Sequence, residues 1–243
     1  ISSPPIGPCS ASIIIPCFNS QSYIENKINI LIKFLNKKDV RYEIIIIDDC
    51  SNDKTFNKLL EINKKNNKTI IIKNIKNIGK SYSIIKGIGK SKYKKIILID
   101  SDLPYFYRLN NIILALEKYD LVMIDRRHQK SKNLDTKKKL YQFLRIIIGL
   151  VFNKLIRLFL PINYKDTQAG LKGFIKPDNF SSLNFISKRF FFDLELILFF
   201  HYNKKKIKTI PVNFRVSKDS SIKIFNINKN IEILKELYKI ICK

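Results

Sequence analysis

Tryptophan is absent from the 243 residues, and cysteine, glycine and proline are scarce, with four, seven and eight residues respectively. The four cysteines, Cys9, Cys17, Cys50 and Cys242, form no C-x-x-C pair, so neither a zinc site nor a disulfide framework is indicated. Unpaired cysteines are typical of a reducing compartment. Because glycine and proline are too few for a long flexible linker, we expect one large domain, with or without a short appendage.

Long apolar runs are also missing. No uninterrupted apolar stretch reaches the roughly 18–20 residues that a membrane-spanning helix needs. The nearest approach, residues 140–162, is interrupted by Arg145, Lys154 and Arg157. This pattern fits either an amphipathic helix in a membrane interface or a core helix with polar edges, and we adopt the interfacial interpretation. Residues 1–10 lack the basic start and apolar core of a secretory signal, and we expect a poorly ordered segment there.

Acidic residues are few, with 20 Asp and Glu against 46 Lys and Arg, which gives a formal net charge of +26. Lysine, isoleucine and asparagine are all abundant, so the excess fits a bias of the source proteome as well as a basic surface. A basic surface would suit an anionic membrane or a phosphorylated substrate. No nucleic-acid-binding signature is present, and we expect no nucleic-acid partner. Phosphate-loop, dinucleotide and nucleophile-elbow motifs are also missing, which argues against kinases, dehydrogenases and serine hydrolases.

The sequence does contain a regular alternation of short apolar runs and longer helical patterns. The apolar runs are 12–18, 42–51, 69–74, 94–100 and 120–125. Runs that are apolar throughout are typical of strands buried on both faces, so we expect an α/β fold with a mainly parallel sheet and helices on both sides. Ligands of such sheets bind at the carboxyl ends of the strands.

Polar residues follow four of these runs where each strand is expected to end. They are Asn19, Asp48, Asp49, Asp100, Asp102, Asp125 and Arg126. In extended backbone, Asp100 and Asp102 point to the same side and can share a hard divalent cation, which prefers oxygen ligands. The alternative is that the two acids cap a helix that follows Pro104.

The order of these motifs resembles the inverting nucleotide-sugar glycosyltransferases of family 2, which have the GT-A fold. The matching segments are SIIIPCFN (12–19), EIIIIDDCSNDKT (43–55), NIGKSYSIIKGI (77–88) and IILIDSDL (96–103). The resemblance implies that the first segment, with Pro16 and Asn19, opens the nucleotide pocket. It also implies that Asp48 or Asp49 recognises the base.

The same resemblance places Gly79 and Lys80 near the nucleotide. It identifies Asp100 and Asp102, with Ser101 between them, as the D-x-D pair that binds Mg²⁺ or Mn²⁺ and so holds the diphosphate. One departure concerns the residue two positions after Asp102. Close relatives often have glutamine there as an extra polar group at the metal, whereas this sequence has Pro104, so metal use has to be tested.

Three later segments resemble the polyprenyl-phosphate hexosyltransferases, the group that includes dolichyl-phosphate glucosyl- and mannosyltransferases. They are YKDTQAGLKGF (164–174), RFFFDLELI (189–197) and TIPVNFRV with SSIK (209–223). The resemblance implies a GT-A domain over 11–225, with a nucleotide-sugar half at 11–103 and an acceptor half at 104–225. We expect 226–243 to form an amphipathic helix.

By position, the resemblance implies that Arg126 and Arg145 bind the lipid phosphate and that Asp102 and Asp166 act in catalysis. Arg127 could replace Arg126, Arg145 could be an interfacial residue, and Asp166 could cap a turn. The residues implied at the acceptor and the sugar are Gln168, Gly170, Asp193, Glu195, Arg215 and Lys223. Asp193 and Glu195 would accept hydrogen bonds from the sugar or pair with Arg189 and its neighbours.

We therefore expect an inverting enzyme that moves a hexose from a nucleotide sugar, of the UDP-glucose or GDP-mannose type, to a polyprenyl phosphate. It would act peripherally at the cytoplasmic, inner face of a membrane, attached directly or through a membrane-anchoring subunit. Two alternatives stay open. One is transfer to a saccharide acceptor in surface-polysaccharide or glycolipid assembly, for which Asp166 or Asp193 would have to be the base. The other is a non-catalytic scaffold that binds sugar nucleotides.

Overall fold

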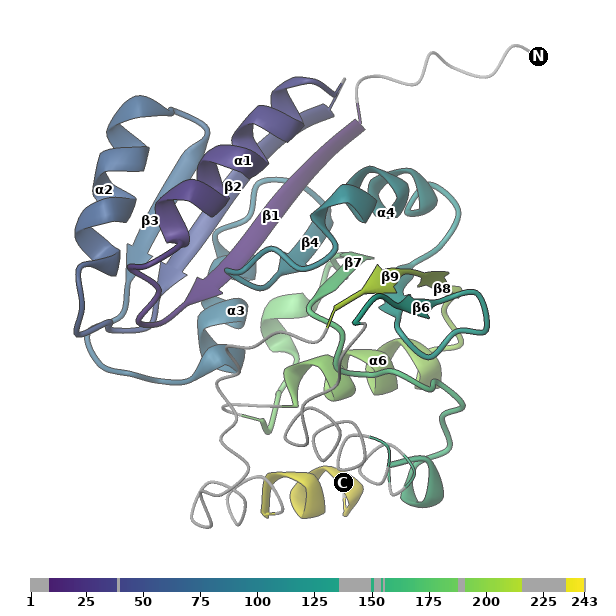
Figure 1. Ribbon diagram of the computed structural model, residues 1–243. Coiled ribbons are helices and arrows are strands. Elements are labelled where there is room, and N and C mark those ends of the chain that lie inside the picture. The colour runs from purple at the N-terminus through teal and green to yellow at the C-terminus, as the bar shows by residue number, and fades with distance from the viewer. Residues whose placement is uncertain are drawn as a thin grey trace.

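The computed structural model describes residues 9–38, 40–135, 150, 154, 156–187, 191–215 and 235–242. Its centre is a seven-stranded sheet with the order β3-β2-β1-β4-β7-β5-β8 (Figure 1). The strands are β1 (Cys9–Cys17), β2 (Val40–Asp48), β3 (Thr69–Lys73), β4 (Lys95–Ile99), β5 (Leu121–Asp125), β7 (Leu171–Ile175) and β8 (Ile207–Pro211). All five predicted apolar runs form strands, β1 to β5, and the α/β fold class is confirmed.

The sheet is parallel except at β7, which runs antiparallel to both of its neighbours, β4 and β5. This strand was not predicted from the sequence. A second, two-stranded parallel sheet joins β6 (Lys132–Asn133) to β9 (Asn213–Phe214). Since β4 belongs to the expected nucleotide-sugar half and β5 and β7 to the expected acceptor half, both halves contribute to one sheet.

Helices cover both faces of the large sheet. They are α1 (Ile24–Asn36), α2 (Thr55–Lys65), α3 (Lys80–Gly89), α4 (Leu109–Ala115) and α6 (Phe192–Tyr202), with short 3-10 helices η1 (Phe106–Arg108) and η2 (Phe180–Ser182). Helices α1, α2 and α4 share one hydrophobic core with their face of the sheet, and α3 and α6 share the other.

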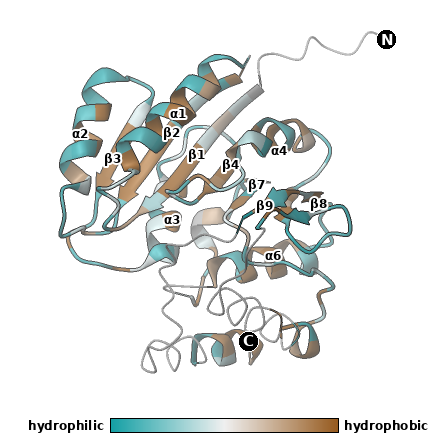
Figure 2. Ribbon diagram, in the orientation of Figure 1, coloured by the Kyte–Doolittle hydropathy of each residue, from teal (hydrophilic) through white to brown (hydrophobic). Residues whose placement is uncertain are grey.

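The apolar spacing in the sequence explains this packing. In α1, Ile24, Ile28, Leu31 and Leu35 are buried and form a single stripe along the helix. Burial of each such side chain contributes roughly 1.5–3 kcal/mol of hydrophobic free energy. Consecutive isoleucines in the strands serve both cores, and Figure 2 shows hydrophobic residues concentrated on β2 and β3 and hydrophilic ones along α2.

The segment expected to lie in a membrane interface, 140–162, is described only at 150, 154 and 156–162. There Ile156 and Leu160 are buried in the core that α3 and α6 share, whereas Leu158 and Phe159 are 74% and 58% exposed. Within the described ranges, none of the helices has the length and apolar character required to cross a bilayer.

Candidate active site at the carboxyl edge of the sheet

The loops after β1 and β2 are tied together at the carboxyl edge of the sheet. The backbone N–H of Asn19 donates to Ser51 Oγ, and Asn19 Oδ1 accepts the backbone N–H of Asn52, both at 2.9 Å. Asn19 has a φ of 49°, a left-handed conformation that asparagine adopts more readily than most residues. Asn19, expected at the nucleotide, therefore fixes the two loops that would border it.

Asp48 and Asp49, the two alternatives for the acid that recognises the base, are both buried and both hydrogen-bonded within the chain. Asp48 accepts hydrogen bonds from the backbone N–H and the hydroxyl of Ser51. Asp49 accepts from Asn74 Nδ2 at 2.8 Å and from the backbone N–H groups of Ile78 and Gly79 at 2.9 Å. Asp49 thus holds the loop that leads into α3, and Asp48 shapes the turn after β2.

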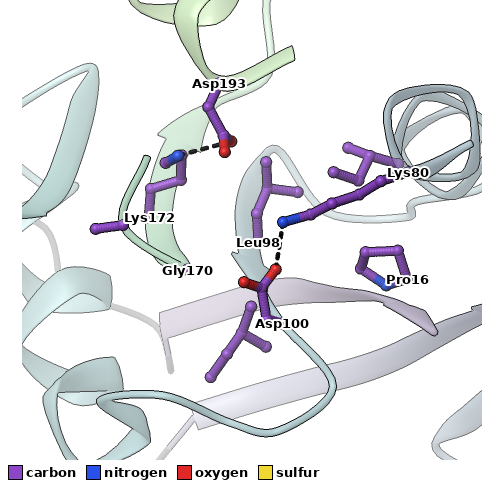
Figure 3. A pocket seen from close by; sticks show the side chains of 10 residues that line it. Pro16, Lys80, Leu98, Asp100, Gly170, Lys172 and Asp193 are labelled. Atoms are coloured by element: carbon purple, nitrogen blue, oxygen red, sulfur yellow. Dashed lines mark ion pairs between the residues drawn. The ribbon is translucent and has the colours of Figure 1, made fainter. Parts of the chain in front are cut away.

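Gly79 and Lys80 stand at the start of α3, and Gly79 has a φ of 92°, which glycine adopts without strain. This turn brings Lys80 Nζ to 2.6 Å from Asp100 Oδ1, at the end of β4 (Figure 3). Burial lowers the pKa of Lys80, but the carboxylates of Asp100 and Asp193 outweigh it and raise the pKa above its ordinary value. Lys80 is therefore a fixed positive charge beside the D-x-D pair.

The D-x-D pair fits a divalent cation. Burial raises the pKa of Asp102, and the neighbouring negative charge of Asp100 raises it further. A cation shared by Asp100 and Asp102 would offset the effect of Asp100 on Asp102, and carboxylate oxygens suit Mg²⁺ or Mn²⁺. Within the described ranges no group of three or more His, Cys, Asp or Glu residues is placed to hold a metal ion, so a cation at this turn would have to be held by these two carboxylates and by ligands from outside the chain.

Gly170 leaves room for this arrangement. Its carbonyl accepts the backbone N–H of Asp100 at 3.0 Å. A Cβ at position 170 would lie 2.5 Å from Asp100 Oδ2 and 2.8 Å from Pro104 Cγ. Gly170 was expected at the acceptor or sugar, and the structure places it directly against the D-x-D turn. Pro104 packs on the same point.

A second ion pair faces the first across the same pocket (Figure 3). Lys172 Nζ of β7 lies 2.6 Å from Asp193 Oδ1, in the first turn of α6. Burial lowers the pKa of Lys172, and Asp193 opposes that shift without cancelling it. The pocket is lined by Pro16, Lys80, Ile84, Leu98, Ile99, Asp100, Ala169, Gly170, Lys172 and Asp193. It brings together predicted nucleotide-side and acceptor-side residues.

Arg126 and Asp166 form a third pair. The guanidinium donates from Nε to Oδ2 at 2.6 Å and from Nη2 to Oδ1 at 2.7 Å, and the Arg126 backbone N–H also donates to Oδ2. Burial raises the pKa of Asp166, but the hydrogen bonds and charge of Arg126 outweigh it and hold the pKa below its usual range. Burial raises the pKa of Tyr105, which follows the D-x-D turn, and the nearby Arg126 guanidinium opposes that shift.

The other predicted residues differ in their setting. Glu195 accepts hydrogen bonds from the backbone N–H groups of Ile186 and Ser187, both at 2.8 Å, and so holds that loop.

Gln168 Nε2 is buried with no acceptor in the part of the chain that the structure describes. Arg215 is exposed after β9. Ser101 Oγ lies 3.1 Å from the hydroxyl of Tyr23. Arg145, Arg189 and Lys223 lie outside the described residues.

Two residues of the site were not identified from the sequence. Lys172 stands in LKGFI, where a single lysine interrupts a buried strand, and this interruption was the available signal. Tyr105 has a φ of 60° next to Pro104, and no local sequence pattern indicates that it lies near Arg126.

Comparison with known proteins agrees with this architecture. The family described as glycosyl transferase family 2 matches residues 12–191. A dolichyl-phosphate beta-glucosyltransferase of Dictyostelium discoideum is 30% identical over 97% of this chain and 75% of its own length. The human dolichyl-phosphate beta-glucosyltransferase is 26% identical over 84% of this chain and 66% of its own length.

Among solved structures, glucosyl-3-phosphoglycerate synthase of Mycobacterium tuberculosis, in complex with Mn²⁺, UDP and phosphoglyceric acid, superposes with a TM-score of 0.69. The match covers 95% of this chain and 78% of that protein at 16% identity, which establishes a shared fold.

Proposed function

The chain belongs to glycosyl transferase family 2 and is a glycosyltransferase with the GT-A fold, and from this premise we propose that it transfers a hexose from a nucleotide sugar to a polyprenyl phosphate. The names of the Dictyostelium and human relatives support glucose as the hexose and dolichyl phosphate as the acceptor. UDP-glucose is then the first donor to test, with GDP-mannose as the alternative.

The choice of acceptor rests on one observation, that both carboxylates that could act as a general base are paired with cationic side chains. Asp166 is held at both oxygens by Arg126, and Asp193 is paired with Lys172. An alcohol acceptor needs a base to remove its proton, and these two carboxylates already form ion pairs with Arg126 and Lys172. A phosphate monoester is ionised at neutral pH and attacks the anomeric carbon without such a base. The geometry therefore supports a phosphate acceptor over a saccharide.

The chain's own residues would position the two substrates. Arg126 lies at the end of β5 with part of its side chain exposed, where its positive charge can attract the acceptor phosphate. Lys80 and the start of α3 would face the diphosphate of the donor. Mg²⁺ or Mn²⁺ on Asp100 and Asp102 would supply charge neutralisation for the leaving nucleoside diphosphate. We also propose, from the resemblance, that Arg145 and Lys223 contribute positive charge.

Contact with a membrane surface is part of this proposal. Leu158 and Phe159 are exposed beside the exposed cations Lys154 and Arg157. Apolar side chains flanked by basic ones suit the surface of an anionic bilayer, where they would bring the site to a lipid-linked acceptor at the inner, cytoplasmic face. Co-sedimentation with anionic liposomes at low salt is expected, and replacing Leu158 and Phe159 with serine should weaken it. Wild-type protein that stays in the supernatant would rule out direct attachment and favour an anchoring subunit.

The test of the reaction is a transfer assay with purified protein, Mn²⁺ or Mg²⁺, a short polyprenyl phosphate and labelled UDP- or GDP-sugars. Label from one donor should enter the organic phase, and EDTA or Asp102→Ala should abolish it. Asp178→Ala, which removes an exposed carboxylate paired with Lys94, is the matched control and should transfer normally. Bound nucleotide sugar without transfer to the lipid would favour a saccharide acceptor. Full biological activity of Asp102→Ala would favour the scaffold alternative.

A further inference from the structure

Lys172 occupies an unusual position for a lysine, in the middle of the large sheet. Its strand, β7, is hydrogen-bonded on both sides, and Lys172 lies in register with Leu98 of β4 and Met123 of β5. Leu98 and Met123 belong to the hydrophobic core beneath α3 and α6. Lys172 is 2% exposed. Burying an ammonium group costs several kcal/mol unless partners compensate, so a lysine at this position requires partners that offset the cost.

The partners within the protein do not satisfy this ammonium. It carries three N–H donors. In the part of the chain that the structure describes, Asp193 Oδ1 lies at ion-pair distance, yet the lysine makes no well-directed hydrogen bond. Four residues earlier, Gln168 Nε2 is likewise buried without an acceptor among the described residues, but Gln168 does not line the pocket. The unsatisfied donors of Lys172, which does line it, indicate a ligand that is rich in acceptor oxygens.

The charges around the pocket indicate which kind of ligand that is. Lys172 is paired with Asp193 on one wall, and Lys80 with Asp100 on the opposite wall (Figure 3). The Lys172 ammonium is matched by the Asp193 carboxylate, so this wall of the pocket is close to neutral and offers no excess positive charge to a phosphate. An ammonium beside a carboxylate does suit a pair of neighbouring hydroxyls, because one can accept from Lys172 while the other donates to Asp193.

The rest of the pocket wall has the mixed apolar and charged character of a sugar-binding site. Ile84, Leu98 and Ala169 line it alongside the two ion pairs. Sugar rings combine apolar C–H faces with polar hydroxyl edges, and binding sites for such ligands combine apolar walls with a few well-placed polar groups. The position beside Asp100 would set this ring next to the diphosphate of a bound donor.

We propose that Lys172 and Asp193 form the subsite that binds the hydroxyls of the transferred hexose, with Lys172 donating to one hydroxyl oxygen and Asp193 accepting from its neighbour. The inference deepens the proposed function and rests on it in one respect, that a nucleotide sugar is the donor. It adds Lys172 as a specificity-determining residue, and it separates the roles of the two lysines. Lys80 serves the diphosphate, and Lys172 serves the sugar.

The experiment compares binding of a nucleotide with binding of the same nucleotide carrying a hexose. Wild-type protein with Mn²⁺ is titrated calorimetrically with UDP, UDP-glucose, GDP and GDP-mannose, and the pair that binds more tightly is carried forward. In Lys172→Met, affinity for the nucleotide sugar should fall about 10-fold or more, the effect of a lost hydrogen bond from a charged group, while affinity for the bare nucleotide changes little.

Lys176→Met is the matched control. Lys176 follows the same strand, but its ammonium donates to the carbonyl and hydroxyl of Ser91, away from the pocket. It should bind both ligands as the wild type does. If Lys172→Met does not fold, because Asp193 is left buried without its cation, Lys172→Met with Asp193→Asn removes both charges and should show the same selective loss.

A series of monodeoxy derivatives of the bound sugar sharpens the result. Removing the hydroxyl that Lys172 contacts should weaken wild-type binding but leave Lys172→Met unaffected. Unchanged affinity of folded Lys172→Met for the nucleotide sugar would overturn the inference, as would an equal loss for nucleotide and nucleotide sugar.

The two proposals fail in different ways. Lys172-dependent hexose binding without transfer to polyprenyl phosphate would reject the acceptor and leave the subsite standing. Normal transfer by Lys172→Met would support the reaction and reject the subsite. Absence of any nucleotide-sugar binding by the wild type would reject both.

Discussion

Arg126 donates two parallel hydrogen bonds to Asp166, from Nε to Oδ2 at 2.6 Å and from Nη2 to Oδ1 at 2.7 Å. The Asp166 side chain is fully buried, and the pair joins the end of β5 to the loop that precedes β7. A planar guanidinium fixed in this way has a defined direction, which suits the binding of a phosphate. Asp166 thus fixes the orientation of the Arg126 side chain.

Replacing Asp166 by asparagine tests this relationship. Asp166→Asn keeps the size of the side chain but removes the charge that orients Arg126, so we expect the free energy of unfolding to fall by about 1–3 kcal/mol. Urea denaturation measures this. Asp178→Asn, at an exposed ion pair with Lys94, is the control and should unfold as the wild type does. Unchanged stability of Asp166→Asn would show that the pair contributes little.

Acidification should remove the stabilisation that the Arg126–Asp166 ion pair provides. The folded pKa of Asp166 lies below its unfolded value, so the stabilisation is complete above the unfolded pKa of about 3.9 and is lost as the pH falls through the folded pKa. The stability difference between wild type and Asp166→Asn should therefore be constant near neutral pH and shrink below about pH 4. Urea melts from pH 7 down to pH 3 measure it. A difference that grows on acidification would contradict the assigned direction.

Asp102 should show the opposite behaviour. Its folded pKa is raised by burial and by Asp100, so ionisation of Asp102 at neutral pH destabilises the fold. Asp102→Asn should raise Tm at pH 7 while abolishing transfer, and the gain in Tm should disappear at pH values below the unfolded pKa. Mn²⁺ should raise the Tm of the wild type more than that of the variant, because an ion that binds the folded state stabilises it. A lower Tm for Asp102→Asn would contradict this account.

Gly170 gives a steric test of the D-x-D turn. Gly170→Ala would place a methyl group 2.5 Å from Asp100 Oδ2, so the carboxylate or the turn must move. Transfer and Mn²⁺ affinity should both fall, and Mn²⁺ titration followed by electron paramagnetic resonance measures the latter. Gly89→Ala is the control, since a Cβ there meets nothing within 4 Å and alanine favours the end of α3. Equal Mn²⁺ affinity of the two variants would show that the turn absorbs the methyl group.

The cysteines allow a chemical check of the edge of the sheet. Burial raises the pKa of the Cys17 thiol, and the carboxylate charges of Asp48, Asp53 and Asp49 add to the shift, so Cys17 stays protonated and unreactive. Cys50, at the partly exposed turn after β2, should be alkylated by iodoacetamide at pH 8 well before Cys17. Peptide mapping by mass spectrometry distinguishes the two sites. Addition of UDP should slow the labelling of Cys50 if the nucleotide binds over this turn.

Much of the sheet was predictable because its parallel strands are nearly continuous runs of isoleucine. The runs 42–51 and 94–100 each end in the acids that the structure places at the carboxyl edge, so position in a strand already indicated position in the site. β7 was not predictable in the same way. LKGFI contains a glycine and a lysine in five residues, and its place between β4 and β5 depends on pairings with distant strands that no local pattern encodes.

The same limit applies within the site. Most of the charged residues could be identified from the sequence, but their partners could not, because ion pairs such as Lys80 with Asp100 and Lys172 with Asp193 join elements far apart in the chain. Asp166 and Asp193 could therefore be proposed as bases, and only the observed pairing argues against that role. Asp49 and Glu195 are similar, since the backbone N–H groups that they accept become visible only once the loops are placed.

The antiparallel insertion of β7 also bears on how the protein is made. During synthesis, β1, β2, β3 and β4 emerge first and can pair with one another, but the outer edge of β4 has to wait for β7. β5 emerges earlier than both of its partners, β7 and β8. A nascent chain at this stage exposes unpaired, isoleucine-rich edges, which are templates for pairing with other chains. Slow translation between β5 and β7 should therefore increase aggregation, and the yield of active protein should depend on chaperones that shield those edges until residue 175 has left the ribosome.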